Sequence, residues 1–202
     1  DLDGVTGLRT IADAHALRDA LAAAEDVVVI GAGFIGLEVA ATAAKRGHRV
    51  TVIEAAGRVM QRAVSPEVSA FFQASHEAAG VRFLMPAGVA RIVGEAGRVV
   101  AVETVAGERI PASLVVVGIG VIPNAELAAA AGLAVGNGIV VDRHLATADS
   151  RVFALGDAAL HPSRWAMAPV RIESVQNATD LAKSLAAWVA GGDPVPYEAV
   201  PW

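Results

Sequence analysis

Gly31, Gly33 and Gly36 form the pattern G-x-G-x-x-G between the apolar run 27–30 and the helix-like stretch 37–46. In a strand–turn–helix context each glycine has a physical role. The first permits a tight turn, the second lets the backbone approach a pyrophosphate, and the third lets the helix pack close to the strand. The helix N-terminus adds free N–H groups and a partial positive charge. The pattern therefore predicts a site for the phosphates of a dinucleotide.

An acidic residue follows this pattern where the motif requires one for the ribose. The second apolar run, 49–53, ends at Glu54, whose carboxylate can accept hydrogen bonds from two ribose hydroxyls. The 2′-phosphate of NADP would lie against that carboxylate, and two unit charges ~4 Å apart repel by roughly 4 kcal/mol at an effective dielectric constant of about 20. We therefore expect NAD rather than NADP. An alternative stays open, in which Arg58 holds a 2′-phosphate.

Two other glycine pairs resemble this motif but lack its context. Gly118 and Gly120 follow an apolar run, yet the place of the third glycine is taken by Pro123. Gly136 and Gly138 lead into an apolar run that is typical of a strand, so no helix dipole follows them. Only the first motif has the whole context, and a tight turn without a ligand is its structural alternative.

Composition narrows the classes of protein to which the chain can belong. Its 202 residues are 54% hydrophobic and 18% charged, enough for one large or two small globular domains. The net charge of −5, without a basic cluster, argues against a nucleic-acid or anionic-membrane surface. The apolar stretches are too short to cross a membrane, and no secretory segment opens the chain. We therefore expect a cytoplasmic protein.

The sequence predicts no catalytic side chain and no metal site. It has no cysteine, so it offers no disulfide, thiolate metal site or cysteine nucleophile. No Ser/His/Asp arrangement is recognisable, and hydride transfer between cofactors requires none. Five histidines show no metal-ligand spacing and are expected in loops or on the surface: His15, His48, His76, His144 and His161.

Apolar periodicity predicts alternating helices and strands, followed by a meander. Thr10 can cap the first helix, with Asp13 in the capping-box position. Helices are expected at 10–24, 35–46, 66–79, within 123–132 and at 173–190, and strands at 27–30, 50–53, 81–84, 114–117, 138–142 and 152–155. Short runs separated by glycine turns predict the antiparallel meander over 89–93, 99–104 and 108–110.

These elements indicate an α/β fold. Its first part is a doubly wound, Rossmann-like parallel sheet in which the antiparallel meander is inserted as a crossover. Residues 139–202 do not complete this sheet and suggest part of a second domain. Asp157 follows the expected strand 152–155, at the edge where open α/β sheets bind ligands. A helix cap or a solvated loop acid is the structural alternative for Asp157.

The run Val152–Ala159, preceded by Leu145-Ala146-Thr147, resembles the second FAD motif of flavoproteins that have two dinucleotide-binding domains. Further stretches narrow the match to the NADH-dependent, FAD-containing ferredoxin reductases of oxygenase systems, the putidaredoxin reductase and biphenyl-dioxygenase reductase type. Those stretches are Leu8–Thr10, Gly36–Ala40, Val68–Phe72, Gly118–Asn124, Asn137–Val140, Arg171–Ala178 and Pro201-Trp202.

This resemblance implies two cofactor sites. The NAD-binding domain would span 10–136, and residues 1–9 and 137–202 would form a partial, second dinucleotide-binding domain for FAD. The pyrophosphate of NAD would be held by the turn residues Gly31, Ala32, Gly33, Phe34, Ile35 and Gly36, and its ribose by Glu54. The nicotinamide end would lie near Glu38, Gly118, Ile119 and Gly120. Glu38 has a solvated helix acid as its alternative, favoured by the helix dipole.

Three residues would face FAD. The resemblance implies that Asp157 hydrogen-bonds the ribityl or adjoining hydroxyls and that the backbone at Val175, at the start of the last helix, meets the flavin ring. The dipole of that helix would stabilise negative charge on the reduced flavin. Arg9 would lie near FAD, with a surface salt bridge as its alternative.

The function implied is that of an FAD-dependent NADH:ferredoxin oxidoreductase, with ferredoxin as partner. Hydride passes from NADH to FAD, and single electrons then pass to the ferredoxin. The family's first glycine motif and its C-terminal interface domain are absent from this sequence. We therefore expect a fragment that binds NADH, holds FAD weakly or not at all, and can self-associate through exposed apolar surface. Two alternatives stay open: a stand-alone NAD-binding module without turnover, and an NADH oxidase or disulfide reductase of the same superfamily.

Overall fold

The structure is a computed structural model that describes residues 2–198, so Pro201-Trp202 lies outside the described residues. The chain divides after Gly120 into two compact units. This division differs from the expected assignment, which places a boundary at residue 136 and groups 1–9 with the second part. Strand β1 (Val5–Thr6) belongs to the first unit because it pairs in parallel with β8 (Leu114–Val117). Which cofactor each unit binds stays a prediction.

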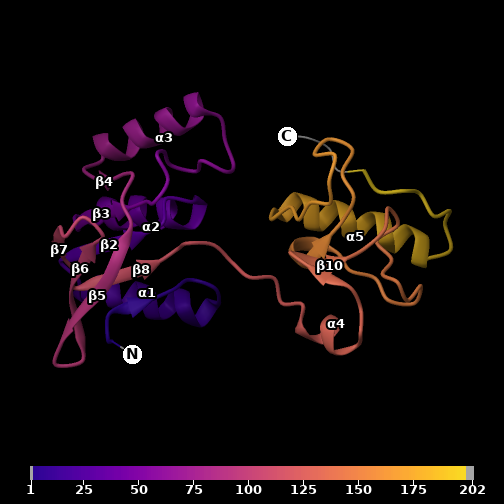
Figure 1. Ribbon diagram of the computed structural model, residues 1–202, viewed down its shortest axis with the longest axis horizontal. Helices are drawn as coiled ribbons and strands as arrows, with labels where there is room; N and C mark the ends of the chain where they lie inside the picture. The colour runs from indigo at the N-terminus through magenta and orange to yellow at the C-terminus, as the bar shows by residue number, and fades with distance from the viewer. Residues whose placement is uncertain (1, 199–202) are drawn as a thin grey trace. The chain divides into compact units, whose positions relative to one another are not determined.

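A five-stranded parallel sheet forms the centre of the first unit (Figure 1). Its strand order is β1-β8-β2-β3-β4. The three further strands are β2 (Asp26–Ile30), β3 (Arg49–Ile53) and β4 (Arg82–Leu84). In this order β2 lies between β8 and β3, so the turn after β2 opens at the centre of the sheet's carboxyl edge. That edge is where open α/β sheets bind ligands.

Helices cover one face of this sheet. They are α1 (Ile11–Ala23), α2 (Phe34–Lys45) and α3 (Pro66–Ala78). Val27 and Val29 of β2 share a core with Leu17 of α1 and Leu37 of α2. The predicted capping box is confirmed at the start of α1, where Thr10 and Asp13 bond each other's backbone N–H groups.

The meander covers the opposite face. It consists of β5 (Val89–Glu95), β6 (Arg98–Thr104) and β7 (Arg109–Pro111), paired antiparallel. Val28 and Val115 point to this side and pack with Val102 and Ile110. Successive residues of a strand face opposite sides, and for that reason the consecutive valines of β2 serve both cores. The predicted α/β fold with an inserted meander is confirmed.

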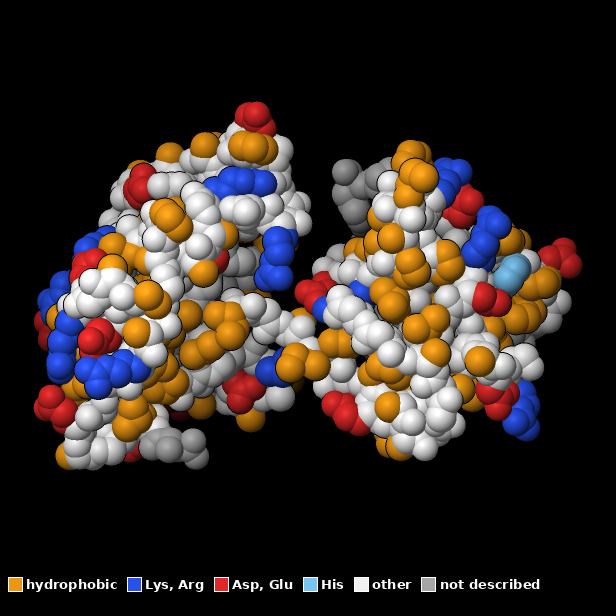
Figure 2. Space-filling model, viewed as in Figure 1, with side chains coloured by type: hydrophobic (Ala, Val, Ile, Leu, Met, Phe, Trp, Pro, Cys, Tyr) orange, Lys and Arg blue, Asp and Glu red, His pale blue; other side chains and the backbone are white. Residues whose placement is uncertain are grey.

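The second unit is built around one long helix, α5 (Val175–Val189), which lies beside β10 in Figure 1. Its smaller elements are α4 (Glu126–Ala130), β9 (Val135–Gly136), β10 (Gly138–Val140), the single 3₁₀ turn η1 (Gly156–Ala158) and β11 (Ala159–Leu160). Leu181 of α5 is completely buried in a core with Val141, Leu145 and Ala154. Apolar side chains also lie on the surface of this unit (Figure 2), and Met167 is 91% exposed.

The expected strand over 152–155 is wrong. Only Phe153 forms a bridge there, to Ala146, and the strand that pairs in parallel with β10 is β11. A short apolar run does not by itself distinguish a strand from a buried loop. Within residues 2–198 no helix combines the length and the apolarity that a membrane span needs.

Candidate functional site

The glycine turn after β2 is packed too tightly for side chains at two of its positions. Gly31 has φ +101°, and a Cβ built there would lie 2.5 Å from the carbonyl oxygen of Gly118. A Cβ on Gly36 would lie 2.1 Å from the carbonyl oxygen of Gly31. Gly33 differs, because nothing lies within 4 Å of its built Cβ. The turn is therefore closed on the protein side and open beside Gly33.

Helix α2 begins on this open side without a side-chain cap. Its N-cap is Gly33, which makes no side-chain hydrogen bond. By contrast, the hydroxyl oxygens of Thr10, Ser65 and Ser174 accept backbone N–H groups at the starts of α1, α3 and α5. The first N–H groups of a helix have no partner within the helix. At α2 these groups and the positive end of the dipole are left for an anion such as a phosphate.

Glu54, at the end of β3, is hydrogen-bonded directly to this turn. Its Oε2 accepts the backbone N–H of Ala32 at 2.7 Å, and its Oε1 accepts that of Ala56 at 2.7 Å. The parallel pairing of Ile30 with Ile53 brings the two strand ends together. The carboxylate is half-buried, and its oxygens, with about four acceptor sites in total, retain capacity for further donors. The predicted ribose acid therefore lies next to the predicted phosphate turn.

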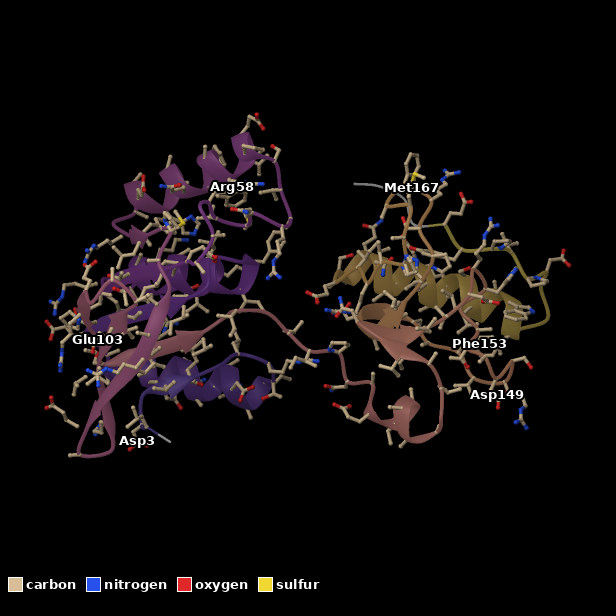
Figure 3. The ribbon with its side chains drawn as sticks, in the orientation of Figure 1. Asp3, Arg58, Glu103, Asp149, Phe153 and Met167 are labelled. Carbon is tan, nitrogen blue, oxygen red and sulfur yellow. The ribbon has the colours of Figure 1, made fainter. Side chains whose placement is uncertain are left out.

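Arg58 is engaged within its own loop. One of its nitrogens donates to the carbonyl oxygen of Val64 at 2.8 Å and to Ser69 Oγ at 2.6 Å, and another donates to the carbonyl oxygen of Gln61 at 2.8 Å. Ser69, buried in α3, donates in turn to the carbonyl oxygen of Val59. Figure 3 shows Arg58 in the loop beside α3. These contacts argue against the alternative in which Arg58 holds a 2′-phosphate.

The remaining predicted NAD residues lie on the same edge or on α2. Gly118 donates its N–H to the carbonyl oxygen of Ile30 at 2.8 Å, which places it beside the glycine turn. Gly120, with φ +132°, and Ile119 are exposed after β8. Phe34 and Ile35 are exposed in the first turn of α2: Phe34 is 58% exposed and Ile35 is 37% exposed.

Glu38 and Arg9 are both exposed, and the structure gives neither a binding contact. Glu38 lies on the solvent side of α2. The backbone N–H of Arg9 donates to Asp13 Oδ2 at 3.0 Å, and its guanidinium forms no ion pair among the described residues. The surface salt bridge considered for Arg9 is therefore not seen, and the roles of both residues stay predictions.

In the second unit the structure brings Asp157 and Val175 together. Both line an open groove of about 760 Å³ along α5, with Ser174 and Lys183 among the other lining residues. Asp157 is exposed in η1, and Val175, the first residue of α5, is 86% exposed. These two predicted flavin residues therefore share one surface, although the strand expected before Asp157 is missing.

Arg171 is a residue of this region to which the sequence assigned no role. Its side chain is only 7% exposed and is paired with Glu173. It also donates to the carbonyl oxygen of Asp157 at 3.3 Å and to Asn137 Oδ1 at 3.4 Å. A buried cation requires such partners. The sequence offers little signal for this role, because Arg171 contacts the backbone of Asp157, which lies 14 residues earlier in the chain.

The histidines do not form a metal centre. Among residues 2–198 no group of three His, Cys, Asp or Glu side chains is arranged to hold a metal ion. The two ring nitrogens of His76 lie 2.8 Å from the carbonyl oxygen of Phe72 and 3.1 Å from that of Leu37, so the ring is in contact with both α3 and α2. His161 lies in an isolated bridge with Val170, outside the named strands, and is buried against the ring of Tyr197 rather than on the surface.

The chain is similar in sequence to curated reductases. Rhodocoxin reductase of Rhodococcus erythropolis is 49% identical over the whole chain, which covers 47% of that protein. Putidaredoxin reductase CamA of Pseudomonas putida is 46% identical over 96% of the chain, which covers 46% of it. The chain thus spans about half the length of the curated relatives it matches.

Solved structures show the same fold. The ferredoxin reductase for the CYP199A2 system from Rhodopseudomonas palustris superposes with a TM-score of 0.96 at 48% identity, covering 100% of this chain and 50% of that one. The reductase in the covalent putidaredoxin reductase–putidaredoxin complex gives a TM-score of 0.92 at 45% identity, covering 98% and 48%. The family model for the pyridine nucleotide-disulphide oxidoreductases matches residues 1–182. The chain belongs to the pyridine nucleotide-disulphide oxidoreductase family.

Proposed function

We propose that this chain provides the NADH-binding part of a cytoplasmic, FAD-dependent NADH:ferredoxin oxidoreductase. The observation that carries the proposal is the hydrogen bond from Ala32 to Glu54, which joins an acid to an uncapped helix N-terminus. The open space beside Gly33 fits a pyrophosphate, and the spare acceptor capacity of Glu54 fits ribose hydroxyls. The name of the solved structure that is 48% identical, a ferredoxin reductase, supports a ferredoxin acceptor.

The chain's own residues bind and orient the cofactors. The N–H groups at the start of α2 neutralise phosphate charge, and Glu54 selects an unphosphorylated ribose because a 2′-phosphate would be repelled. In the second unit Asp157 can accept flavin hydroxyls, and the dipole of α5 would act on the flavin ring. When bound, the nicotinamide and the flavin would supply the hydride chemistry, and the protein would hold and orient the two cofactors.

Calorimetric titration with NADH and NADPH tests this proposal. We expect saturable NADH binding and at least tenfold weaker NADPH binding, because the Glu54 carboxylate repels a 2′-phosphate. A tenfold difference in affinity corresponds to about 1.4 kcal/mol. Failure to bind NADH would overturn the NAD site. Ferricyanide reduction with NADH and added FAD then separates a reductase from a binding module, because a module binds NADH without turnover.

A further inference from the structure

The side chain of Asn177 connects the entrance of α5 to the segment that follows the helix. Asn177 is 3% exposed and stands third in α5. Its Nδ2 donates to the carbonyl oxygen of Ile172 at 3.1 Å, and its Oδ1 accepts the hydroxyl of Tyr197 at 3.0 Å. Leaving a buried donor or acceptor without its partner costs about 1–3 kcal/mol. The amide therefore favours one arrangement of the first turn of α5 and the loop before it.

Tyr197 is itself held from three directions. Its backbone N–H donates to the carbonyl oxygen of Arg143 at 2.7 Å. Its ring meets the buried ring of His161 edge to face, with centroids 5.6 Å apart, and packs against the core around Leu181. The next residue, Glu198, forms an ion pair with Arg164 at 2.9 Å. The hydroxyl that reaches Asn177 is thus fixed by contacts outside α5.

The two ends of this connection lie beside the predicted flavin residues. Ser174 caps α5 by accepting the N–H of Asn177 at 3.1 Å, and Ser174 and Val175 both line the groove that contains Asp157. Ile172, whose carbonyl oxygen Asn177 binds, adjoins Arg171, which donates to the carbonyl oxygen of Asp157. A shift of Asn177 would therefore be transmitted to both sides of the groove.

We propose that Tyr197 and Asn177 are a pair of positioning residues that hold the first turn of α5 in place for the flavin. The flavin part of the inference, that the pair positions a flavin, rests on the proposed function. The structural part, that the pair holds the first turn of α5, rests on the hydrogen bonds alone. In the contacts above, the hydroxyl of Tyr197 reaches Asn177 and not a residue that lines the groove. Tyr197 therefore acts on the groove through Asn177. The segment after α5 thereby takes part in building the groove.

Hydrogen exchange on the chain without ligand tests the structural part. Tyr197→Phe keeps the ring and removes the hydroxyl, and we expect amide exchange over 172–178 to become about fivefold faster, as loss of one hydrogen bond implies. Exchange over 34–45 should not change. Ser163→Ala, which removes a hydroxyl that accepts the loop N–H groups of Trp165 and Ala166, is the matched control. Unchanged exchange over 172–178 in Tyr197→Phe would overturn the proposal.

Titration with FAD tests the flavin part. We expect Tyr197→Phe to weaken FAD binding about fivefold and to alter the visible circular dichroism of the bound flavin, while NADH binding stays unchanged. Equal FAD affinity with an unchanged flavin spectrum would show that the pair does not position the flavin. If the unaltered chain binds no FAD at all, as the expectation of weak or absent FAD binding allows, the pair positions no flavin in this chain, whereas hydrogen exchange still decides whether the pair holds α5.

Discussion

Ala32 donates its backbone N–H to Glu54 across 2.7 Å, and this bond joins the turn after β2 to the end of β3. The second carboxylate oxygen accepts the N–H of Ala56 at 2.7 Å. Glu54 thus orders two loops before any ligand arrives. The same carboxylate that would bind the ribose also shapes the phosphate turn, so structural and binding effects have to be separated in any experiment on Glu54.

Changing Glu54 should reverse the preference between the two nucleotides. In Glu54→Arg we expect NADH affinity to fall and NADPH affinity to rise, because a cation replaces the charge that repels the 2′-phosphate. Glu54→Gln, which keeps one acceptor oxygen, should lose roughly tenfold in NADH affinity, the effect of about 1.4 kcal/mol. Calorimetry with both nucleotides measures these changes. An equal loss for NADH and NADPH in Glu54→Arg would mean that Glu54 is only structural.

Alanine at two glycines should separate stability from binding. Gly36→Ala places a Cβ 2.1 Å from the carbonyl oxygen of Gly31, and we expect a loss of about 3 kcal/mol in the free energy of unfolding. Gly33→Ala meets no atom within 4 Å, so it should cost less than about 1 kcal/mol while weakening NADH binding. Urea unfolding and NADH titration check both variants. Full NADH affinity in Gly33→Ala would contradict a pyrophosphate at this turn.

Removing Arg58 should lower stability without changing nucleotide preference. Its guanidinium donates to Val64, Ser69 and Gln61, and Arg58→Ala leaves the buried Ser69 hydroxyl with one partner fewer. We expect a loss of about 1–3 kcal/mol in the free energy of unfolding. The exposed Arg62 is the control, and Arg62→Ala should change stability by less than about 0.5 kcal/mol. A selective loss of NADPH binding in Arg58→Ala would restore the 2′-phosphate interpretation.

Tyr197 should make the chain less stable in alkaline solution. Burial, with a smaller contribution from Asp180, raises the pKa of Tyr197 above its ordinary value of 10.0. The folded state therefore retains the proton more strongly than the unfolded state, and stability falls as pH rises through the folded pKa. The stabilisation is fully present below about pH 10.

Tyr197 is the only tyrosine of the chain, so the ultraviolet absorbance of tyrosinate reports its titration alone. We expect the folded chain to titrate at higher pH than the chain in denaturant. In Tyr197→Phe the fall in unfolding free energy above pH 10 should become shallower. Coincident titration curves for the folded and denatured chain would refute the burial of the phenol.

Most elements of the first unit could be predicted because each is marked by residues within its own short stretch of sequence. The capping box of Thr10 and Asp13 marks the start of α1, and β2 and β8 were expected from their apolar runs. The two-residue strands β1 and β11 were not expected, because two residues are too few for a pattern and such a strand is defined by its pairing with another strand. For the same reason the apolar run 152–155, which lacks a ladder partner, did not become a strand.

The sequence by itself determined the glycine turn, the acid that follows it and the order of helices and strands, since residue type and spacing decide these. Only the tertiary structure decided which side chains meet. The parallel register of β2 and β3 brings Ala32 to Glu54, the loop fold turns Arg58 inward, and Tyr197 reaches Asn177 across 20 residues. Such contacts depend on packing between distant segments, and a local pattern carries no information about that packing.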